Sequence, residues 1–114
     1  MSPITTHVLD TALGEPARGL KIELSRLENG AWSVVNRGKT NEDGRIGDLM
    51  KAGDLKAGTY RMLFMTGDYL ERIHSAGFYP EAPIIFEIRE GQEQEHFHVP
   101  LLLSPYGYST YRGS

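Results

Sequence analysis

Apolar and polar residues alternate along most of the chain, and this alternation predicts a series of short β-strands. Leu20, Ile22 and Leu24 alternate with polar residues, which is the pattern of a strand with one buried face. Asn29–Gly30 follows this run and predicts a tight hairpin turn, because both central residues of such a turn adopt positive φ. Further strands are predicted over Ile4–Asp10, Trp32–Arg37, Ile46–Leu49, Thr59–Thr66, Ile84–Arg89, Glu95–Leu103 and Tyr108–Tyr111.

One segment departs from this pattern and predicts a short helix. In Asp68–Ser75, Leu70 and Ile73 are three residues apart, Asp68 suits the N-cap position, and Gly77 follows as a stop signal. The predicted strands, seven or eight in number, follow one another at intervals of about 8–12 residues, which is typical of a β-sandwich. Together these elements predict an all-β sandwich with one short helix.

Composition fits one folded domain and narrows the possible functions. Hydrophobic residues make up 39% of the 114 residues and no linker divides the chain, so we expect one domain over residues 1–114. The net charge of −3 argues against nucleic acid as a partner, and no apolar run is long enough to cross a membrane. The chain has no cysteine, which excludes disulfides and thiolate chemistry. No signal peptide is recognisable, so we expect a cytoplasmic location, or a periplasmic one if a leader has been removed.

The last part of the chain predicts self-association. Leu101–Leu103 is apolar on both faces of its predicted strand, and Tyr108–Tyr111 carries no Lys or Glu that would deter pairing at a sheet edge. We therefore expect a subunit interface in this region.

Two of the four histidines, His96 and His98, are two residues apart on a predicted strand and should face the same side. Three interpretations are open. The pair could be solvated imidazoles on an exposed face, a zinc site completed by a third histidine such as His7, or a general acid or base. No carboxylate lies where it could complete a metal site, so we expect no metal.

Two other segments carry candidate chemistry. His7 shares the alternating face of Thr5 and Leu9, where a lone histidine is commonly structural. Arg45 follows a turn-rich loop and is either an ordinary surface arginine or a planar donor for an anionic or carbonyl-rich ligand. The terminal residues, through Ser114, would either fray or lie close to the fold.

Three segments together resemble one known family. Thr6–Thr11 followed by Gly14–Ala17, the loop Thr40–Arg45, and the tail His96–Ser114 are similar to segments of the 5-hydroxyisourate hydrolases, the transthyretin-related enzymes of urate breakdown. The tail ends in Tyr111–Ser114, the Tyr-Arg-Gly-Ser tetrapeptide that distinguishes these enzymes from the hormone carrier transthyretin. The resemblance extends over nearly the whole chain.

The resemblance implies a two-sheet, eight-stranded transthyretin-like sandwich with one short helix, assembled as a homotetramer with active sites in a channel between subunits. It implies hydrolysis of 5-hydroxyisourate to 2-oxo-4-hydroxy-4-carboxy-5-ureidoimidazoline without a cofactor or metal. Matching positions give catalytic roles to His7, Arg45 and His98, and no role is carried onto His96. The substrate-binding residues implied by the tetrapeptide are Tyr111, Arg112 and Ser114.

A mechanism that fits these residues uses an imidazole to activate water for attack on a ring carbonyl. His98 is expected to be the base and His7 to position the water or share the proton, although the two roles can be exchanged. Arg45 would hold the ring and stabilise developing negative charge. The alternative is a transthyretin-like protein that binds small ligands without turnover, which would show saturable binding and no reaction.

Overall fold

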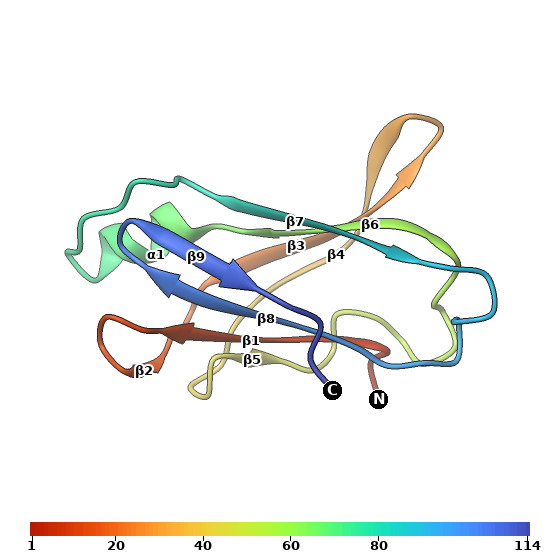
Figure 1. Cartoon of the computed structure of the whole chain (residues 1–114), viewed down its shortest axis with the longest axis horizontal. Helices are drawn as coiled ribbons and strands as arrows, with labels where there is room; N and C mark the ends of the chain where they lie inside the picture. The colour runs from red at the N-terminus through yellow and green to blue at the C-terminus, as the bar shows by residue number, and fades with distance from the viewer.

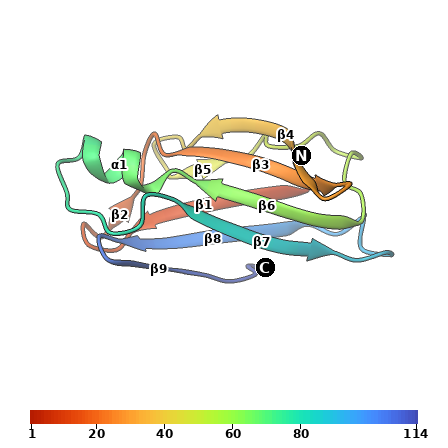
Figure 2. The same cartoon turned by 90° about the horizontal axis from the view of Figure 1, so that it is seen from above.

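Two β-sheets pack face to face in the computed structural model, which describes residues 1–114 (Figure 1). The first sheet has the order β2-β1-β8-β9, with β5 paired to β1 beside β2. Its strands are β1 (Ile4–Asp10), β2 (Glu15–Pro16), β5 (Arg45–Ile46), β8 (Phe97–Ser104) and β9 (Gly107–Thr110). The second sheet has the order β4-β3-β6-β7, with β3 (Lys21–Glu28), β4 (Ala31–Lys39), β6 (Gly58–Phe64) and β7 (Ala82–Ile88). Figure 2 shows the strands of both sheets running along the same long direction.

The alternation in the sequence matches this architecture. β1 has the predicted bounds, and in β6 the residues Tyr60, Met62 and Phe64 point into the core. β6 lies between β3 and β7, in the interior of the second sheet. The β3–β4 hairpin turns at Asn29 and Gly30, whose φ angles are 52° and 80°. The structure has nine strands; the one that the sequence pattern did not predict is β2, which has only two residues.

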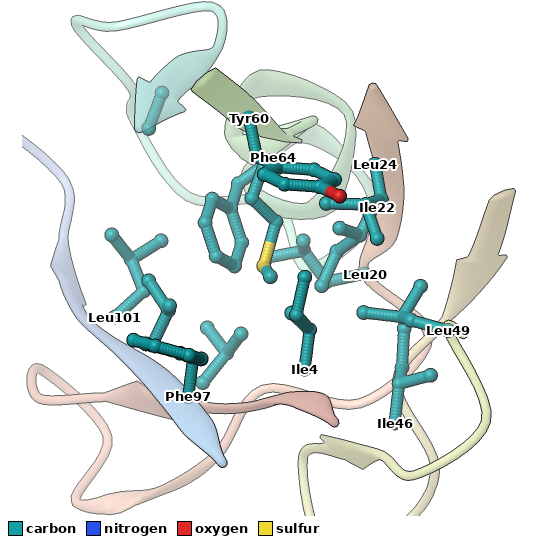
Figure 3. Packing of buried hydrophobic residues seen from close by; sticks show 14 of the residues in the cluster. Ile4, Leu20, Ile22, Leu24, Ile46, Leu49, Tyr60, Phe64, Phe97 and Leu101 are labelled. Carbon is teal, nitrogen blue, oxygen red and sulfur yellow. The ribbon is translucent and has the colours of Figure 1, made fainter. Parts of the chain in front are cut away.

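Between the sheets lies one hydrophobic core of 21 buried residues. Figure 3 shows side chains from both sheets meeting there, with Ile4, Phe97 and Leu101 from the first sheet facing Tyr60 and Phe64 from the second. Burial of this apolar surface is the main stabilising contribution to the fold. The core behind β1 and β8 is fully buried, so it gives a rigid base to the side chains on the outer face of that sheet.

The single helix, α1 (Thr66–Arg72), differs in its ends from the prediction. It begins two residues earlier, its N-cap residue is Met65 without a side-chain cap, and Asp68 lies in the first turn, with a carboxylate oxygen 3.5 Å from Nε of Arg72. The N-cap role expected for Asp68 was therefore wrong. The helix ends early because His74 takes a left-handed conformation with φ 57°. α1 is neither long nor apolar enough to cross a membrane.

A buried carboxylate ties α1 to the first sheet. Asp10, at the end of β1, accepts hydrogen bonds from the Tyr69 hydroxyl at 2.9 Å and from the backbone N–H groups of Ala12 and Leu13 at 3.1 and 3.0 Å. Burial, together with the hydrogen bond to Asp10, raises the pKa of the Tyr69 hydroxyl. The network satisfies a buried charge and fixes the end of β1 that lies away from the histidines.

Candidate active site

β1 directs Thr5 and His7 to the outer face of the first sheet. Side chains alternate along a strand, so Ile4, Thr6 and Val8 are buried in the core while Thr5 and His7 are only half-buried on the opposite face. The predicted sharing of one face by Thr5 and His7 is confirmed.

The pairing of β1 with its two neighbours brings residues from distant parts of the chain beside these side chains. β8 runs parallel to β1 in a register that pairs Thr5 with His98, and β5 runs antiparallel in a register that pairs His7 with Arg45. Side chains of paired residues lie on the same face of a sheet. His7, Arg45 and His98 therefore meet on one outer surface.

The loop before β5 is built to place Arg45 against β1. The side-chain oxygen of Asn41 accepts hydrogen bonds from the backbone N–H groups of Asp43 and Arg45, at 2.9 and 3.0 Å. Gly44 has φ 74°, and its carbonyl oxygen accepts a 2.8 Å hydrogen bond from the N–H of Val8. A Cβ at Gly44 would lie 2.5 Å from the Val8 carbonyl oxygen, so only glycine allows this approach.

Two histidines share one threonine hydroxyl. Oγ1 of Thr5 lies 2.9 Å from Nδ1 of His98 and 2.9 Å from Nε2 of His96. His96 directly precedes β8, and its ring stacks on that of His98 with centroids 6.4 Å apart. This confirms that His96 and His98 face the same side, while Phe97 between them is buried in the core.

The end of the chain lies against His98. Gly113 forms an isolated β-bridge with His98, and its N–H donates a 2.8 Å hydrogen bond to the His98 carbonyl oxygen. A Cβ at Gly113 would lie 2.6 Å from Cδ2 of the imidazole, closer than any real contact of this kind. A glycine is thus required beside His98, and the next residue, Ser114, lines the same pocket as the imidazole.

These groups line a shallow, open pocket of about 250 Å³. Its walls come from β1, β5, β8 and the end of the chain: Thr5, Thr6, Arg45, Ile46, Gly47, His96, His98 and Ser114. A larger groove of about 870 Å³ lies on the second sheet, over β3, β4 and residues 48–56, but no histidine lines it. Of these two, only the smaller pocket brings an imidazole and a guanidinium together.

Burial and a neighbouring cation disfavour the protonated forms of His98 and His7. Burial lowers the pKa of His98 below its usual 6.5, and the positive charge of Arg45 lowers it further, with smaller contributions from His96 and His7. Burial and Arg45 likewise lower the pKa of His7. Arg45 forms no ion pair within the chain, and its guanidinium is exposed beside both rings. Near neutral pH the pocket thus offers His98 as an uncharged proton acceptor beside the cation of Arg45, and His7, which does not line the pocket, lies next to Arg45 on the same sheet face.

Two of the predicted site residues lie elsewhere within the chain. Tyr111 and Arg112 line a groove between β7 and β9 rather than the histidine pocket. The Arg112 guanidinium donates a 3.1 Å hydrogen bond to the Glu95 carboxylate and lies 4.3 Å from the ring centroid of Phe97. The structure therefore brings together His7, Arg45, His98 and Ser114 in one chain, and leaves Tyr111 and Arg112 outside that group.

Comparison with known proteins shows the family of the chain. Residues 4–113 match the model of the HIUase/Transthyretin family. The chain belongs to this family. Its HIUase/transthyretin relatives include 5-hydroxyisourate hydrolase 2 of Rhizobium meliloti (strain 1021), which is 50% identical over 116 residues covering 97% of this chain and 95% of that protein.

Solved structures of the HIUase/transthyretin family have the same fold. The structure of Klebsiella pneumoniae 5-hydroxyisourate hydrolase is 39% identical, with a TM-score of 0.86 over 100% of both chains. The structure of sea bream transthyretin in complex with thyroxine is 31% identical, with a TM-score of 0.91 over 98% of this chain and 95% of that one. The likeness to both confirms the predicted transthyretin-like sandwich of two sheets with one short helix.

The sequence pattern did not single out Thr5, and the family resemblance implied no role for His96. The signal for Thr5 was present, because Thr5 lies two residues before His7 on the same alternating face. Its contact with both His96 and His98 was not predictable, since it depends on the parallel pairing of β1 with β8 across most of the length of the chain.

Proposed function

We propose that this member of the HIUase/transthyretin family hydrolyses 5-hydroxyisourate as an enzyme of urate degradation, producing 2-oxo-4-hydroxy-4-carboxy-5-ureidoimidazoline. One observation supports this above all. Two imidazoles with lowered pKa values, His7 and His98, lie beside the unpaired guanidinium of Arg45 on one sheet face. The names of the similar Rhizobium and Klebsiella proteins indicate the substrate.

His98 is the general base in this proposal. Its Nδ1 faces Thr5, which leaves Nε2 as the ring nitrogen available to take a proton from water. The water oxygen then forms a bond to a ring carbonyl carbon. His7 positions that water or shares the proton. A lowered pKa suits this role, because the base must be unprotonated at the working pH.

Arg45 stabilises the charge that develops in this step. When water attacks, the carbonyl oxygen becomes an oxyanion, and a guanidinium already in place stabilises it without reorganisation. The carbon–nitrogen bond of the ring then breaks, and the proton held by the imidazole passes to the leaving nitrogen. Ser114 lines the pocket and is placed to hydrogen-bond the substrate. No covalent intermediate is required.

The proposed enzyme is a homotetramer with its sites in a channel between subunits. The histidine pocket lies on an open sheet face, which a second subunit would cover. Ile85 and Tyr111 leave 60% and 57% of their surface exposed in the groove between β7 and β9. Because Tyr111 and Arg112 are outside the pocket of a single chain, their substrate-binding role requires this assembly. Light scattering coupled to size-exclusion chromatography should give the mass of four chains, and a monomer would contradict the assembly.

A carrier function is the second candidate, because the fold is at least as close to that of a transthyretin solved with thyroxine as to that of the Klebsiella hydrolase. An assay that follows the absorbance of freshly generated 5-hydroxyisourate distinguishes the two. The hydrolase should accelerate its loss catalytically, at protein concentrations far below that of the substrate. A carrier would bind a small aromatic ligand saturably in calorimetry and leave the rate of loss at the spontaneous value.

A further inference from the structure

The Thr5 hydroxyl forms the centre of a hydrogen-bonded chain that includes a histidine outside the proposed reaction. Its oxygen is 2.9 Å from Nε2 of His96 and 2.9 Å from Nδ1 of His98. His98 is half-buried, whereas His96 is exposed at the rim of the same pocket. The three side chains thus connect the proposed base to solvent.

A hydroxyl has a single hydrogen, so this chain has two arrangements in which Thr5 donates that hydrogen to one of the two histidines. In the first, Nδ1–H of His98 donates to Thr5 and Thr5 donates to Nε2 of His96, so Nε2 of His98 carries no proton. In the second, Nε2–H of His96 donates to Thr5, Thr5 donates to Nδ1 of His98, and neutral His98 carries its proton on Nε2. Only the first arrangement leaves His98 able to take a proton from water at Nε2.

We propose that Thr5 and His96 are positioning residues which set the tautomer of His98 and shuttle its second proton during the reaction. This inference rests on the proposed function of His98 as general base. Protonation of His96 places a hydrogen on its Nε2, so Thr5 can no longer donate to His96 and the first arrangement is lost. When the Thr5 hydroxyl then donates to Nδ1 of His98, neutral His98 carries its proton on Nε2 and is a proton donor rather than a base.

The proton movements balance over one turnover. After Nε2 of His98 takes a proton from water, its Nδ1 proton moves to Oγ1 of Thr5 while the Thr5 hydroxyl proton moves to Nε2 of His96. The positive charge passes from the ring beside Arg45 to the exposed ring, and neutral His98 holds the water-derived proton on Nε2. As that proton goes to the leaving nitrogen, the other two return along the chain, and the first arrangement is restored.

The surroundings of His96 suit it to hold this charge briefly. Its own ring is exposed, so water stabilises the cation, and acidic residues lie close by in the sequence and around the adjoining surface. The groups that face it from all sides are His98, Arg45, Arg112, Glu93, Glu95 and Met1. Of these, the Glu95 carboxylate already pairs with Arg112 at 3.1 Å.

Nitrogen-15 NMR of histidine-labelled protein reads the tautomer directly and needs no substrate. At a pH where both rings are neutral, His98 should carry its proton on Nδ1. Thr5→Val, which keeps the shape of the side chain but removes the hydroxyl, should abolish this preference, and Thr5→Ser should retain it. A His98 tautomer that is the same in Thr5→Val as in the parent would overturn the proposal.

Kinetics provides a second readout. Thr5→Val should lower kcat at least about tenfold with little change in KM, because a His98 ring without a fixed tautomer transfers protons less well but leaves substrate binding intact. Thr5→Ser should keep a kcat near that of the parent. His96→Gln offers a side-chain carbonyl to the Thr5 hydroxyl but cannot titrate. It can keep the His98 tautomer but cannot take up the shuttled proton, so kcat at neutral pH should fall, and the loss of kcat on acidification should depend on one proton fewer than in the parent.

The outcomes separate this inference from the proposed function. If Thr5→Val turns over like the parent, or His96→Gln keeps the parent's acid profile, the proposed proton transfer through Thr5 and His96 is wrong. The role of His98 as general base is then tested separately by His98→Ala. If His98→Ala is itself fully active, the proposed function is wrong. A lower kcat in Thr5→Val with an unchanged His98 tautomer would mean that Thr5 has only a structural role. That result would also overturn the proposed proton transfer through Thr5 and His96.

Discussion

The backbone N–H of Gly113 donates a 2.8 Å hydrogen bond to the carbonyl oxygen of His98, and a Cβ on Gly113 would lie 2.6 Å from Cδ2 of the same residue's imidazole. The terminal tetrapeptide thus supports the candidate base through a close backbone approach that a side chain would block. Gly113 is therefore as necessary to the geometry of the site as Ser114, the residue that follows it.

Gly113→Ala should therefore damage catalysis more than stability. The added methyl group would lie 2.6 Å from Cδ2 of His98 and must push the ring away from Thr5 and the pocket. We expect kcat to fall at least about tenfold because a small misplacement of a catalytic group is costly, with little change in the melting temperature. Gly107→Ala is the matched control, since a Cβ there meets nothing closer than 3.8 Å. Equal activity of the two variants would contradict the argument.

Arg45 should affect both binding and the titration of the histidines. Arg45→Gln removes the charge that helps to lower the pKa values of His98 and His7, so these pKa values rise. The acid limb of the kcat/KM profile should then move to higher pH, and kcat/KM at its plateau should drop about 10²-fold from loss of oxyanion stabilisation. Arg45→Lys keeps the charge and should keep the acid limb in place while losing part of the rate. An acid limb that does not move in Arg45→Gln would show that the guanidinium does not act on these rings.

The parent protein should retain activity at mildly acidic pH. The pKa values of His98 and His7 both lie below the usual 6.5, because burial and Arg45 disfavour the imidazolium. A base with a lowered pKa stays unprotonated as pH falls, so kcat/KM should be constant from neutral pH to below 6.5 and decline only under more acidic conditions. A midpoint of the acid limb above 6.5 would be inconsistent with this environment.

The Asp10–Tyr69 pair should matter for stability and not for chemistry. Tyr69→Phe leaves one buried oxygen of Asp10 without its 2.9 Å donor, which should lower the free energy of unfolding by about 1–3 kcal/mol. Asp10→Ala removes the acceptor of three hydrogen bonds and should cost more. Urea denaturation measures both, with the exposed Tyr106→Phe as control. The folded fraction of each variant should turn over substrate like the parent.

Much of the fold was predictable because strands have a period of two. The alternation in Ile4–Asp10 gave both the bounds of β1 and the side on which His7 lies, and Asn29–Gly30 located the hairpin. β2 was missed because two residues have no periodicity. The helix ends were wrong because the conformation of His74 and the uncapped start at Met65 leave no trace in hydrophobic pattern.

The candidate site was predictable only in its residue types. Local pattern could not indicate that β1 pairs in parallel with β8, and this pairing is what places Thr5 between His96 and His98. Nor could it show that Arg112 turns toward Glu95 and Phe97, away from the pocket. Family resemblance supplied His7, Arg45 and His98, and the sheet registers explain why those three positions belong together.

The most direct test of the proposed activity is the rate at which His98→Ala removes freshly generated 5-hydroxyisourate. His74→Asn is the matched control, because His74 is exposed, lies beyond α1 and has a left-handed backbone that asparagine tolerates. We expect kcat of His98→Ala to fall about 10²–10⁴-fold, as for loss of a general base, with His74→Asn unchanged. Turnover by His98→Ala at the rate of the His74→Asn control would contradict the account.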